Sequence, residues 1–501
     1  MQTALVEKTV HFFNGLPRYF FLLAILLLYF FRFELDINED HYMLLAKQFY
    51  DPDWVPASFT FNEFAGPRVL YQYLTGFLLE FLSFEMVAAL GKVLLCVALC
   101  FPLSKLYQLF NFTNIDILLH LPILYLPRQS FVGEEVIFLS FEPKVFAYVF
   151  AFFAIYYLLI EKYRLATLFL ILSTWFHLLV GGWIIAYFGL YHLVRERSIK
   201  KTLLLGLIYL AGMLPFLIYL LPSLTGNFNP AATPVGLDWI YTHFLKPHHT
   251  AIWVDTAYFL KGFLICTTFF LLCLFVFNKF EHELNRKINL WNILIFAGTF
   301  FSIILAWFDH SGFFVKYFPF LIYLQVVLLL RQFFLKESVV QYFQFGILIY
   351  FILVVFTKTG KHLALDWYAW FTDRQKDPNY LDMTDYIAQN TQQYDVLLLL
   401  PKLADPDDYY SYDMDTEIVR WTRRSRFVAF HAAPVSPGTD KLYQWYQRIN
   451  AKKEIIQDPN KLCTLDKQFK IDYILTDYQL AGDSCYQLQY KNEMYFLYQI
   501  E

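Results

Sequence analysis

The sequence predicts a polytopic α-helical membrane protein with about 11 spans and an exported C-terminal α/β domain. Of its 501 residues, 58% are hydrophobic and only 17% are charged, whereas a soluble globular protein averages about 25% charged residues. The charges are sparse up to about Thr357 and dense after it. This distribution indicates a membrane module at about 1–358 and a water-soluble domain at about 359–501. The net charge of −3 and the lack of a basic stretch with interleaved aromatic residues argue against a nucleic-acid partner.

The first long apolar run, Pro17 to Phe33, has no small-residue cleavage site and is followed at once by acidic residues. We therefore interpret it as a retained span rather than a cleaved signal. The segment Tyr71–Phe84 is short and is interrupted by Gln72, Gly76 and Glu80, so we expect a helix along the membrane surface. The further runs of spanning or near-spanning length, judged against roughly 20 residues for a full crossing, are Met86–Phe110, Ile115–Pro127, Pro143–Ile160, Leu165–His177, Leu178–Val194, Thr202–Leu221, Thr256–Phe277, Asn289–Phe308, Phe313–Leu330 and Val339–Phe356.

The distribution of positive charge predicts the topology. If the N-terminus is cytoplasmic, the basic residues of the inner segments are Lys8, Arg18, Lys105, Lys162, Arg164, Arg195, Arg197, Lys200, Lys201, Lys279, Arg286, Lys287, Arg331 and Lys336. The short outer segments keep only a few, such as Lys47, Arg68, Arg128 and Lys246. This is the positive-inside bias. With an odd number of spans, the acidic loop at 34–85 and the tail after Thr357 both face the exterior.

The stretch from Arg164 to Arg195 is too long for one crossing and too short for two. Two helices of about 15 residues would each reach about 22 Å, short of a hydrocarbon core of about 30 Å. Their joint, from His177 to Gly182, would then lie below the outer surface, where polar backbone is tolerated only inside protein or beside water. The sequence therefore predicts a cavity that opens to the exterior.

The tail alternates helical and extended patterns, which predicts a small α/β domain with a largely parallel sheet. Helices are expected at Asp382–Asn390, Glu417–Thr422 and Asp440–Asn450, and extended segments at Asp395–Pro401, Arg426–Phe430, Asp472–Thr476 and Met494–Ile500. The tail has no glycine-rich phosphate loop and no nucleophile elbow, so we assign it no chemistry of its own.

The six cysteines divide into two groups. Cys463 and Cys485 are the only pair in the tail, where thiols can oxidise, and we predict that they form a disulfide. Cys96, Cys100, Cys266 and Cys273 lie in predicted spans and are expected to be ordinary buried residues. No cysteine or histidine spacing resembles a zinc site.

Four carboxylates, Glu34, Asp36, Glu39 and Asp40, lie within seven residues directly after the first span. One interpretation is structural: Asn38 could cap a helix whose first turn holds Glu39 and Asp40. The other is chemical: a carboxylate held at the outer face can take a proton from an attacking hydroxyl, or help to hold a divalent cation.

The other candidates also have two interpretations. His177 is either a hydrogen-bonded structural residue or, as a polar residue at membrane depth, a functional one. Glu142 and Lys144 open a span and would lie at the rim of the predicted cavity, whereas Glu134 and Glu135 suit a solvated loop. Five residues of outer loops either are solvated or contact an anionic headgroup: Lys246, His248, His249, Asp309 and His310. Three arginines in the tail, Arg423, Arg424 and Arg426, either form an unoccupied surface or bind phosphate.

This layout resembles the GT-C superfamily of membrane glycosyltransferases. The shared features are an acidic pair in the first exterior loop (Glu39-Asp40, then Tyr42), a surface helix that begins near Gly66-Pro67-Arg68, short middle helices with a histidine at the tip, and an exported C-terminal domain. Within the superfamily the chain is most similar to uncharacterised bacterial members, through Glu142-Pro143-Lys144, His177 with Gly181, and Arg423-Arg424-Ser425-Arg426.

The resemblance implies transfer of a sugar from a polyprenyl-phosphate donor to a glycan, lipid or protein acceptor at the outer face of the bacterial cytoplasmic membrane. Either Glu39 or Asp40 would be the base, and the other would orient the acceptor or a metal. The residues that would contact substrate are Asp36, Arg68, Glu142, Lys144, His177, His248 and His249. Among them, Arg68, Lys144 and His177 would contact the donor phosphate or pyrophosphate, because fixed cations must stabilise a departing phosphate. The alternative is a non-catalytic member or a transporter in envelope polysaccharide assembly. A transporter is expected to have paired charges in mid-span and broken helices repeated in two halves of the chain. Here the charges cluster at the outer rim, and the sequence shows no second half, which favours the enzyme over a transporter but not over a non-catalytic member.

Overall fold

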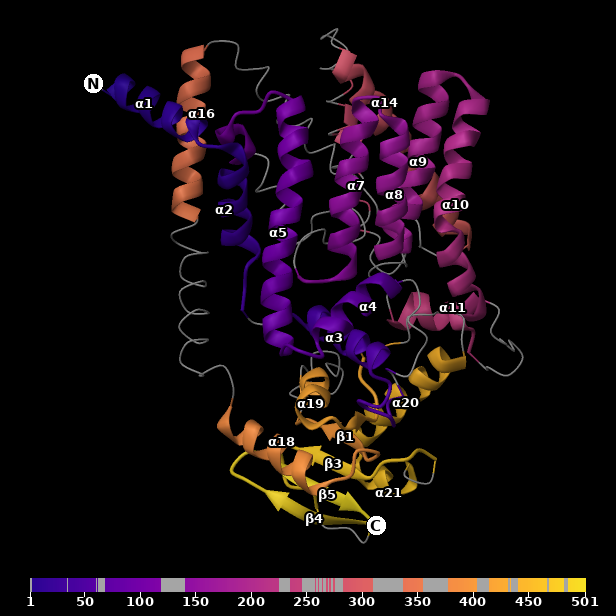
Figure 1. Cartoon of the computed structure of the whole chain (residues 1–501). Helices are drawn as coiled ribbons and strands as arrows, with labels where there is room; N and C mark the ends of the chain where they lie inside the picture. The colour runs from indigo at the N-terminus through magenta and orange to yellow at the C-terminus, as the bar shows by residue number, and fades with distance from the viewer. Residues whose placement is uncertain are drawn as a thin grey trace. The chain divides into compact units, whose positions relative to one another are not determined.

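The computed structural model describes residues 2–33, 35–59, 61, 68–118, 140–224, 235–245, eight positions between 257 and 274, and residues 283–309, 337–354, 377–402, 414–430, 433, 440–465, 468–481 and 485–501. The chain divides into two compact units (Figure 1). Unit 1 comprises Met1–Arg32, Ala89–Tyr219 and Thr242–Leu365, and unit 2 comprises Phe33–Ala88, Leu220–Tyr241 and Asp366–Glu501. The acidic loop at 34–85 therefore belongs to the same unit as the C-terminal tail.

Long helices make up the described part of unit 1, and two of them, α5 and α10, continue into unit 2. They are α1 (Gln2–Gly15), α2 (Arg18–Phe30), α5 (Phe84–Leu109), α7 (Pro143–Leu159), α8 (Tyr163–Phe176), α9 (Leu178–Glu196), α10 (Ile199–Leu224), α14 (Glu283–Asp309) and α16 (Glu337–Val354). In Figure 1, helices α7, α8, α9 and α10 run side by side. Helix α7 packs on α8 and α9, and α14 packs on both α9 and α7.

Three of the described helices are long and apolar enough to cross a membrane: Phe84–Leu109, Leu178–Glu196 and Ile199–Leu221. The predicted count of about 11 spans is thus not confirmed. Helices α7 and α8 are apolar but shorter, with 17 and 14 residues. The predicted runs Ile115–Pro127, Thr256–Phe277 and Phe313–Leu330 lie wholly or partly outside the described residues.

Helix α1 was not among the predicted elements, because its mixed polarity gives no spanning run. It meets α2 at an angle of 92°, and the break falls at Pro17, which lacks the backbone N–H that a continuous helix needs. One face of α1 packs Val6 and Val10 against Ile115. The amide of Asn114 donates to the carbonyls of Phe13 and Leu16, at 2.9 and 2.8 Å, which satisfies acceptors that a helix end leaves open.

The predicted helical hairpin is present, although only its first arm has the predicted length. Helix α8 has 14 residues, which corresponds to about 21 Å, whereas α9 has 19. The two arms approach closely at Gly181, where a Cβ would overlap Thr174. The hairpin therefore requires a residue without a side chain at this position.

In unit 2, the acidic loop forms two helices, α3 (Ile37–Tyr50) and α4 (Val69–Leu78), which pack against each other. Helix α4 is shorter than the predicted segment Tyr71–Phe84, because the chain turns before α5 begins. Its outward side chains include Tyr73 and Phe77, which are 56% and 47% exposed. This apolar face suits a membrane surface, and the placement along that surface stays a prediction.

Replacing Gly76 with alanine should separate α3 from α4. A Cβ at Gly76 would lie 2.6 Å from the Cβ of Tyr50 and would also overlap the carbonyl oxygen of Ala46. Backbone atoms of a packed helix cannot move aside easily, so we expect the free energy of unfolding to fall by about 1–3 kcal/mol. Thermal unfolding of the full chain in detergent measures it. The matched control is Gly182→Ala in α9, where a Cβ meets nothing within 4 Å. Equal melting temperatures for both variants would contradict close packing at Gly76.

The C-terminal part of unit 2 is an α/β domain. Its helices are α18 (Pro378–Asn390), α19 (Met414–Thr422), α20 (Asp440–Gln457), the 3-10 turn η5 (Pro459–Lys461) and α21 (Leu462–Leu465). Its strands are β1 (Val396–Leu400), β2 (Ser425–Arg426), β3 (Tyr473–Thr476), β4 (Tyr486–Lys491) and β5 (Phe496–Ile500). Earlier in the chain, a short turn of helix α11 (Leu237–Trp239) precedes a π-helical segment, η3 (Ile240–Leu245).

The sheet is mixed rather than largely parallel. Its strand order is β2-β1-β3-β5-β4; β1 is parallel to β2 and β3, whereas β5 is antiparallel to β3 and β4. Strand β1, with the sequence Val-Leu-Leu-Leu-Leu, is buried throughout, as its continuous apolar run predicts. Strand β4 was not predicted, although its alternation of glutamine with tyrosine and leucine is a strand pattern; it lies at the edge of the sheet and is largely exposed.

Residues of the acidic loop form part of the core of this domain. Leu44, Leu45, Trp54, Val55 and Phe61 are buried in one cluster with side chains of α18, β1, α19, β3 and β5. The amide of Gln393, just before β1, also donates to the carbonyls of Asp53 and Trp54, at 2.8 and 3.2 Å. The loop and the tail therefore share one hydrophobic core, although more than 300 residues separate them in the sequence.

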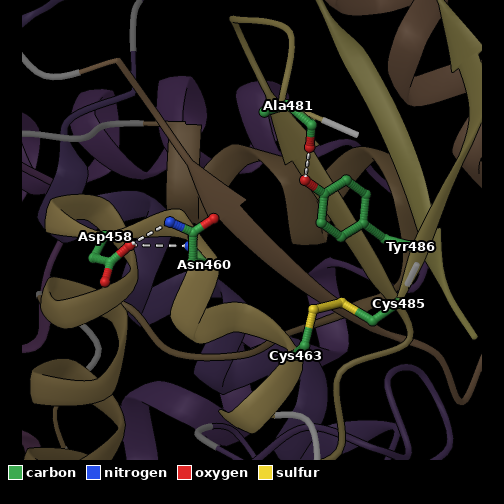
Figure 2. The surroundings of a disulfide bond; sticks show 6 residues. All are labelled: Asp458, Asn460, Cys463, Ala481, Cys485 and Tyr486. Carbon is green, nitrogen blue, oxygen red and sulfur yellow. Dashed lines mark hydrogen bonds between the residues drawn. A yellow bond between two sulfur atoms is a disulfide. The ribbon is translucent and has the colours of Figure 1, made fainter. Parts of the chain in front are cut away.

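The predicted disulfide between Cys463 and Cys485 is confirmed, with 5.7 Å between the Cα atoms (Figure 2). It ties α21 to the start of β4, where the hydroxyl of Tyr486 donates to the carbonyl of Ala481. Loop-closure entropy gives such a crosslink a contribution of about 3 kcal/mol. Cys96 and Cys100 are buried free thiols, as predicted, and Cys266 and Cys273 lie outside the described residues.

Candidate functional site

Two of the four clustered acids cap helix α3. The carboxylate of Asp36 accepts from the N–H of Asn38 at 2.9 Å, and the carboxylate of Glu39 accepts from the N–H of Asp36 at 2.9 Å. The carboxylate of Asp36 also accepts from the N–H of Glu39, and this reciprocal pair of Asp36 and Glu39 is a capping box. The prediction that Asn38 caps the helix is wrong, because Asp36, two residues earlier, reaches the open N–H groups. Glu39 is fully buried, so its local geometry is that of a cap.

Asp40 has a different environment. Its side chain is 4% exposed, and its Oδ1 lies 3.3 Å from Nη1 of Arg420, a residue of α19 in the C-terminal domain. The same guanidinium lies 3.5 Å from Glu85 and 3.4 Å from Glu417. We call Asp40, Glu85, Glu417 and Arg420 the Arg420 cluster. Three carboxylates from three helices thus converge on one buried cation.

Aromatic side chains enclose this cluster. The guanidinium carbon of Arg420 lies 6.0 Å from the ring centre of Phe84 and 5.4 Å from that of Trp421. Tyr380 of α18 is close enough to interact electrostatically with Asp40, Glu417 and Arg420. Burial raises the pKa of Tyr380 well above its usual value, and the neighbouring carboxylates add to this rise. Tyr380 is therefore a neutral hydroxyl beside the charged residues.

Arg68 begins α4 and stacks on the ring of Tyr42, with 4.5 Å from the guanidinium carbon to the ring centre. Tyr42 in turn contacts Tyr71 edge to face, with 6.4 Å between ring centres. The Nε of Arg68 is buried and has no hydrogen-bond partner among the residues that the structure describes. Asp36, Glu39, Asp40 and Arg68 of the predicted site thus all belong to unit 2, where α3 packs on α4.

In unit 1, Glu142 is the N-terminal cap residue of α7, followed by Pro143. It is 2% exposed, accepts from the hydroxyl of Ser140 at 2.7 Å and lies 3.6 Å from Nζ of Lys144. His177 caps α9, because its Nδ1 accepts from the N–H of Val180 at 3.3 Å. In its local geometry, His177 is thus a hydrogen-bonded cap residue, as its structural interpretation expects.

Sequence reasoning missed Lys92. This residue of α5 is buried, and its Nζ donates to the carbonyl of Arg32 at 2.9 Å. It lines a small pocket together with Ser140 and apolar side chains that include Phe30 and Val145. The run Met86–Phe110 holds two lysines, of which Lys105 lies near the predicted inner end. Lys92, far from that end, is the signal that could have been found, because charged residues within such runs are rare and are functional candidates by default.

Arg424 and Arg426, considered as a phosphate-binding fork, are 7% and 2% exposed. Arg424 donates to the carbonyls of Ala388, Thr391 and Thr422, so neither arginine belongs to a bare surface. Arg423 is exposed. The candidates His248, His249, Glu134, Glu135, Lys246 and His310 lie outside the described residues.

Within the described ranges, no group of three or more His, Cys, Asp or Glu side chains is arranged to hold a metal ion. The carboxylates that do converge in unit 2 converge on Arg420. The sequence matches no protein-family model and no curated protein. The local chemistry is therefore the basis on which a function can be proposed.

Proposed function

We propose that this chain transfers a sugar from a polyprenyl-phosphate donor to an acceptor at the outer face of a bacterial cytoplasmic membrane, and that Asp40 is the general base. A carboxylate in this role must lie within reach of the acceptor hydroxyl whose proton it takes. The observation that carries the proposal is the buried position of Asp40 in the first turn of α3, shortly after the apolar helix α2. Glu39 is engaged in the capping box, which favours Asp40 over Glu39 as the base.

The departing lipid phosphate would require fixed positive charge, because preorganised cations stabilise charge that develops in the transition state. Arg68, which belongs to unit 2 as Asp40 does, is the candidate for this role. The apolar helices α5, α9 and α10 suit a protein that takes a lipid-linked substrate from the bilayer. In this proposal the N-terminus is cytoplasmic and unit 2 faces the exterior.

A second candidate function is a non-catalytic member of the same superfamily that acts in envelope polysaccharide assembly. The observation that favours it is that both acids of the pair have structural contacts. Glu39 serves the capping box, and Asp40 forms an ion pair with Arg420. In a protein without transferase activity, these contacts alone would account for both side chains.

Asp40→Asn and Glu39→Gln, made separately, test the proposal. The activity measured is the release of undecaprenyl phosphate from a panel of undecaprenyl-phosphate-linked hexose, N-acetylhexosamine and pentose donors, with the full-length chain in membranes. We expect Asp40→Asn to lower the rate by about 10²–10⁴-fold, the usual contribution of a general base. Glu39→Gln is the matched control: glutamine also completes a capping box, so its rate should stay within a few-fold of the wild type.

Expression and the Cys463–Cys485 disulfide report whether each variant is folded. Wild-type transfer by a folded Asp40→Asn variant would end the assignment of Asp40. The lack of transfer by the wild type with every donor of the panel would favour the non-catalytic function.

A further inference from the structure

The side chain of Arg420 meets Asp40 across 380 positions of the sequence. It comes from α19 of the C-terminal domain, whose sequence motifs point to no chemistry, and α19 packs on α3. Its side chain is 6% exposed and that of Asp40 is 4% exposed, so both partners of the ion pair are largely buried. The domain therefore reaches into the candidate site with a fixed positive charge.

Stability alone does not explain a buried pair of this kind. Burying two charges costs free energy by desolvation, and replacing such a pair with well-packed apolar residues is often neutral or stabilising. The rings of Phe84 and Trp421 lie beside Arg420, and both rings pack against the hydrophobic core of unit 2, which apolar residues in place of the ion pair would extend. An arginine at this position is better explained by what it does to the carboxylate beside it.

We propose that Arg420 is a positioning residue for Asp40: it keeps the carboxylate ionised and fixes its orientation toward the acceptor. This inference rests on the transferase function proposed above. The guanidinium is itself held in place, since it lies within 3.5 Å of Glu85 and 3.4 Å of Glu417. The C-terminal domain would then take part in the reaction through Arg420.

The pH dependence of transfer distinguishes this role from a purely structural one. Among the residues that the structure describes, the titratable or charged groups around Asp40 include Arg420 and Glu417 on α19, Glu85 at the start of α5, Tyr380 on α18, and Glu39 and His41 on α3. Removing the positive charge leaves Asp40 among carboxylates, and a carboxylate without a nearby cation is protonated more easily. The acid limb of the pH–activity profile, where transfer falls as Asp40 becomes protonated, should therefore move to higher pH.

The test compares Arg420→Gln with Arg420→Lys in the full-length chain, using whichever undecaprenyl-phosphate sugar the wild type consumes. We expect Arg420→Gln to lower the rate at neutral pH at least about ten-fold and to move the acid limb up by about one pH unit, the smaller end of the effect of a charge at this distance. Arg420→Lys keeps the charge but not the planar fork, so its limb should stay near that of the wild type while its rate falls several-fold.

Arg423→Met is the matched control, because Arg423 is exposed and lies on the same segment; its limb should not move. If Asp40→Asn abolishes transfer but Arg420→Gln keeps the wild-type limb, Arg420 is only structural and the inference is overturned while the transferase stands. If Asp40→Asn transfers normally, the proposed function fails, and the inference falls with it. Should Arg420→Gln not accumulate, a wild-type rate for Arg420→Lys would overturn the positioning role.

Discussion

Residues 377–501, expressed without residues 33–88, are expected not to fold into a stable domain. Five side chains of the missing segment, Leu44, Leu45, Trp54, Val55 and Phe61, are buried in its core. Fully burying one such side chain contributes about 1.5–3 kcal/mol. The five together therefore contribute roughly 8–15 kcal/mol, which is as much as the whole stability of a typical domain.

The missing segment also leaves polar groups without their partners. The amide of Gln393 loses its acceptors on Asp53 and Trp54, and Arg420 loses the carboxylates of Asp40 and Glu85. An ion left buried after its partner is removed costs about 3–5 kcal/mol. The lost hydrogen bonds of Gln393 and the unpaired charge of Arg420 destabilise the fragment further, in addition to the lost apolar burial. We therefore expect residues 377–501 alone to be an expanded, unfolded chain.

Circular dichroism in the near ultraviolet and limited proteolysis measure the effect on the fragment. Residues 33–88 joined to residues 377–501 by a flexible glycine-serine linker should restore a protease-resistant core. This fusion requires detergent, because Tyr73, Phe77 and Phe81 expose apolar surface around α4. The control is the same fusion with Leu44→Asp, which places an unpaired charge in the shared core. A cooperative melting transition for residues 377–501 alone would show that the loop is only an addition to a complete domain.

This shared core marks the boundary of what the sequence could predict. Local patterns identified the apolar helices, the buried strand β1 and the disulfide, because each depends on neighbouring residues or on a choice between very few cysteines. The prediction missed β4, although the alternation of glutamine with tyrosine and leucine in this exposed edge strand was a signal that could have found it. Local patterns could not place the segment containing Trp54 inside the C-terminal domain, because no periodicity records a partner more than 300 residues away.

The same limit applies to the candidate site. A sequence shows that Asp40 is acidic and follows a span, but the partner that determines its chemistry, Arg420, lies 380 positions away. Capping was partly predictable, since an acid followed three residues later by glutamate is a known signal at helix starts. That pattern is present at Asp36 and Glu39, and the structure assigns the cap to Asp36 instead of Asn38.

Replacing Arg424 with methionine should destabilise the C-terminal domain by roughly 3–5 kcal/mol. Its guanidinium donates to the carbonyls of Ala388 and Thr391 at 2.9 and 2.6 Å, and to that of Thr422 at 2.8 Å. These carbonyls lie at the C-terminal ends of α18 and α19, where a helix leaves acceptors open. Methionine fills a similar volume but leaves these acceptors without a donor, and each buried, unsatisfied carbonyl costs about 1–3 kcal/mol.

The measurement is thermal unfolding of the full chain in detergent. Proteolytic cleavage within the C-terminal domain serves as the readout of its unfolding. Arg423→Met is the control: this neighbouring arginine is exposed, and surface substitutions usually change stability by less than about 0.5 kcal/mol. Burial lowers the pKa of Arg424, yet an arginine stays protonated in proteins, so the difference between the variants should persist across neutral pH. Equal stability would mean that these bonds contribute nothing to the fold, and the guanidinium would again be a candidate for phosphate. A large loss of stability would show instead that this arginine joins two helix ends, and that the positive charge for a lipid phosphate in unit 2 must be sought at Arg68.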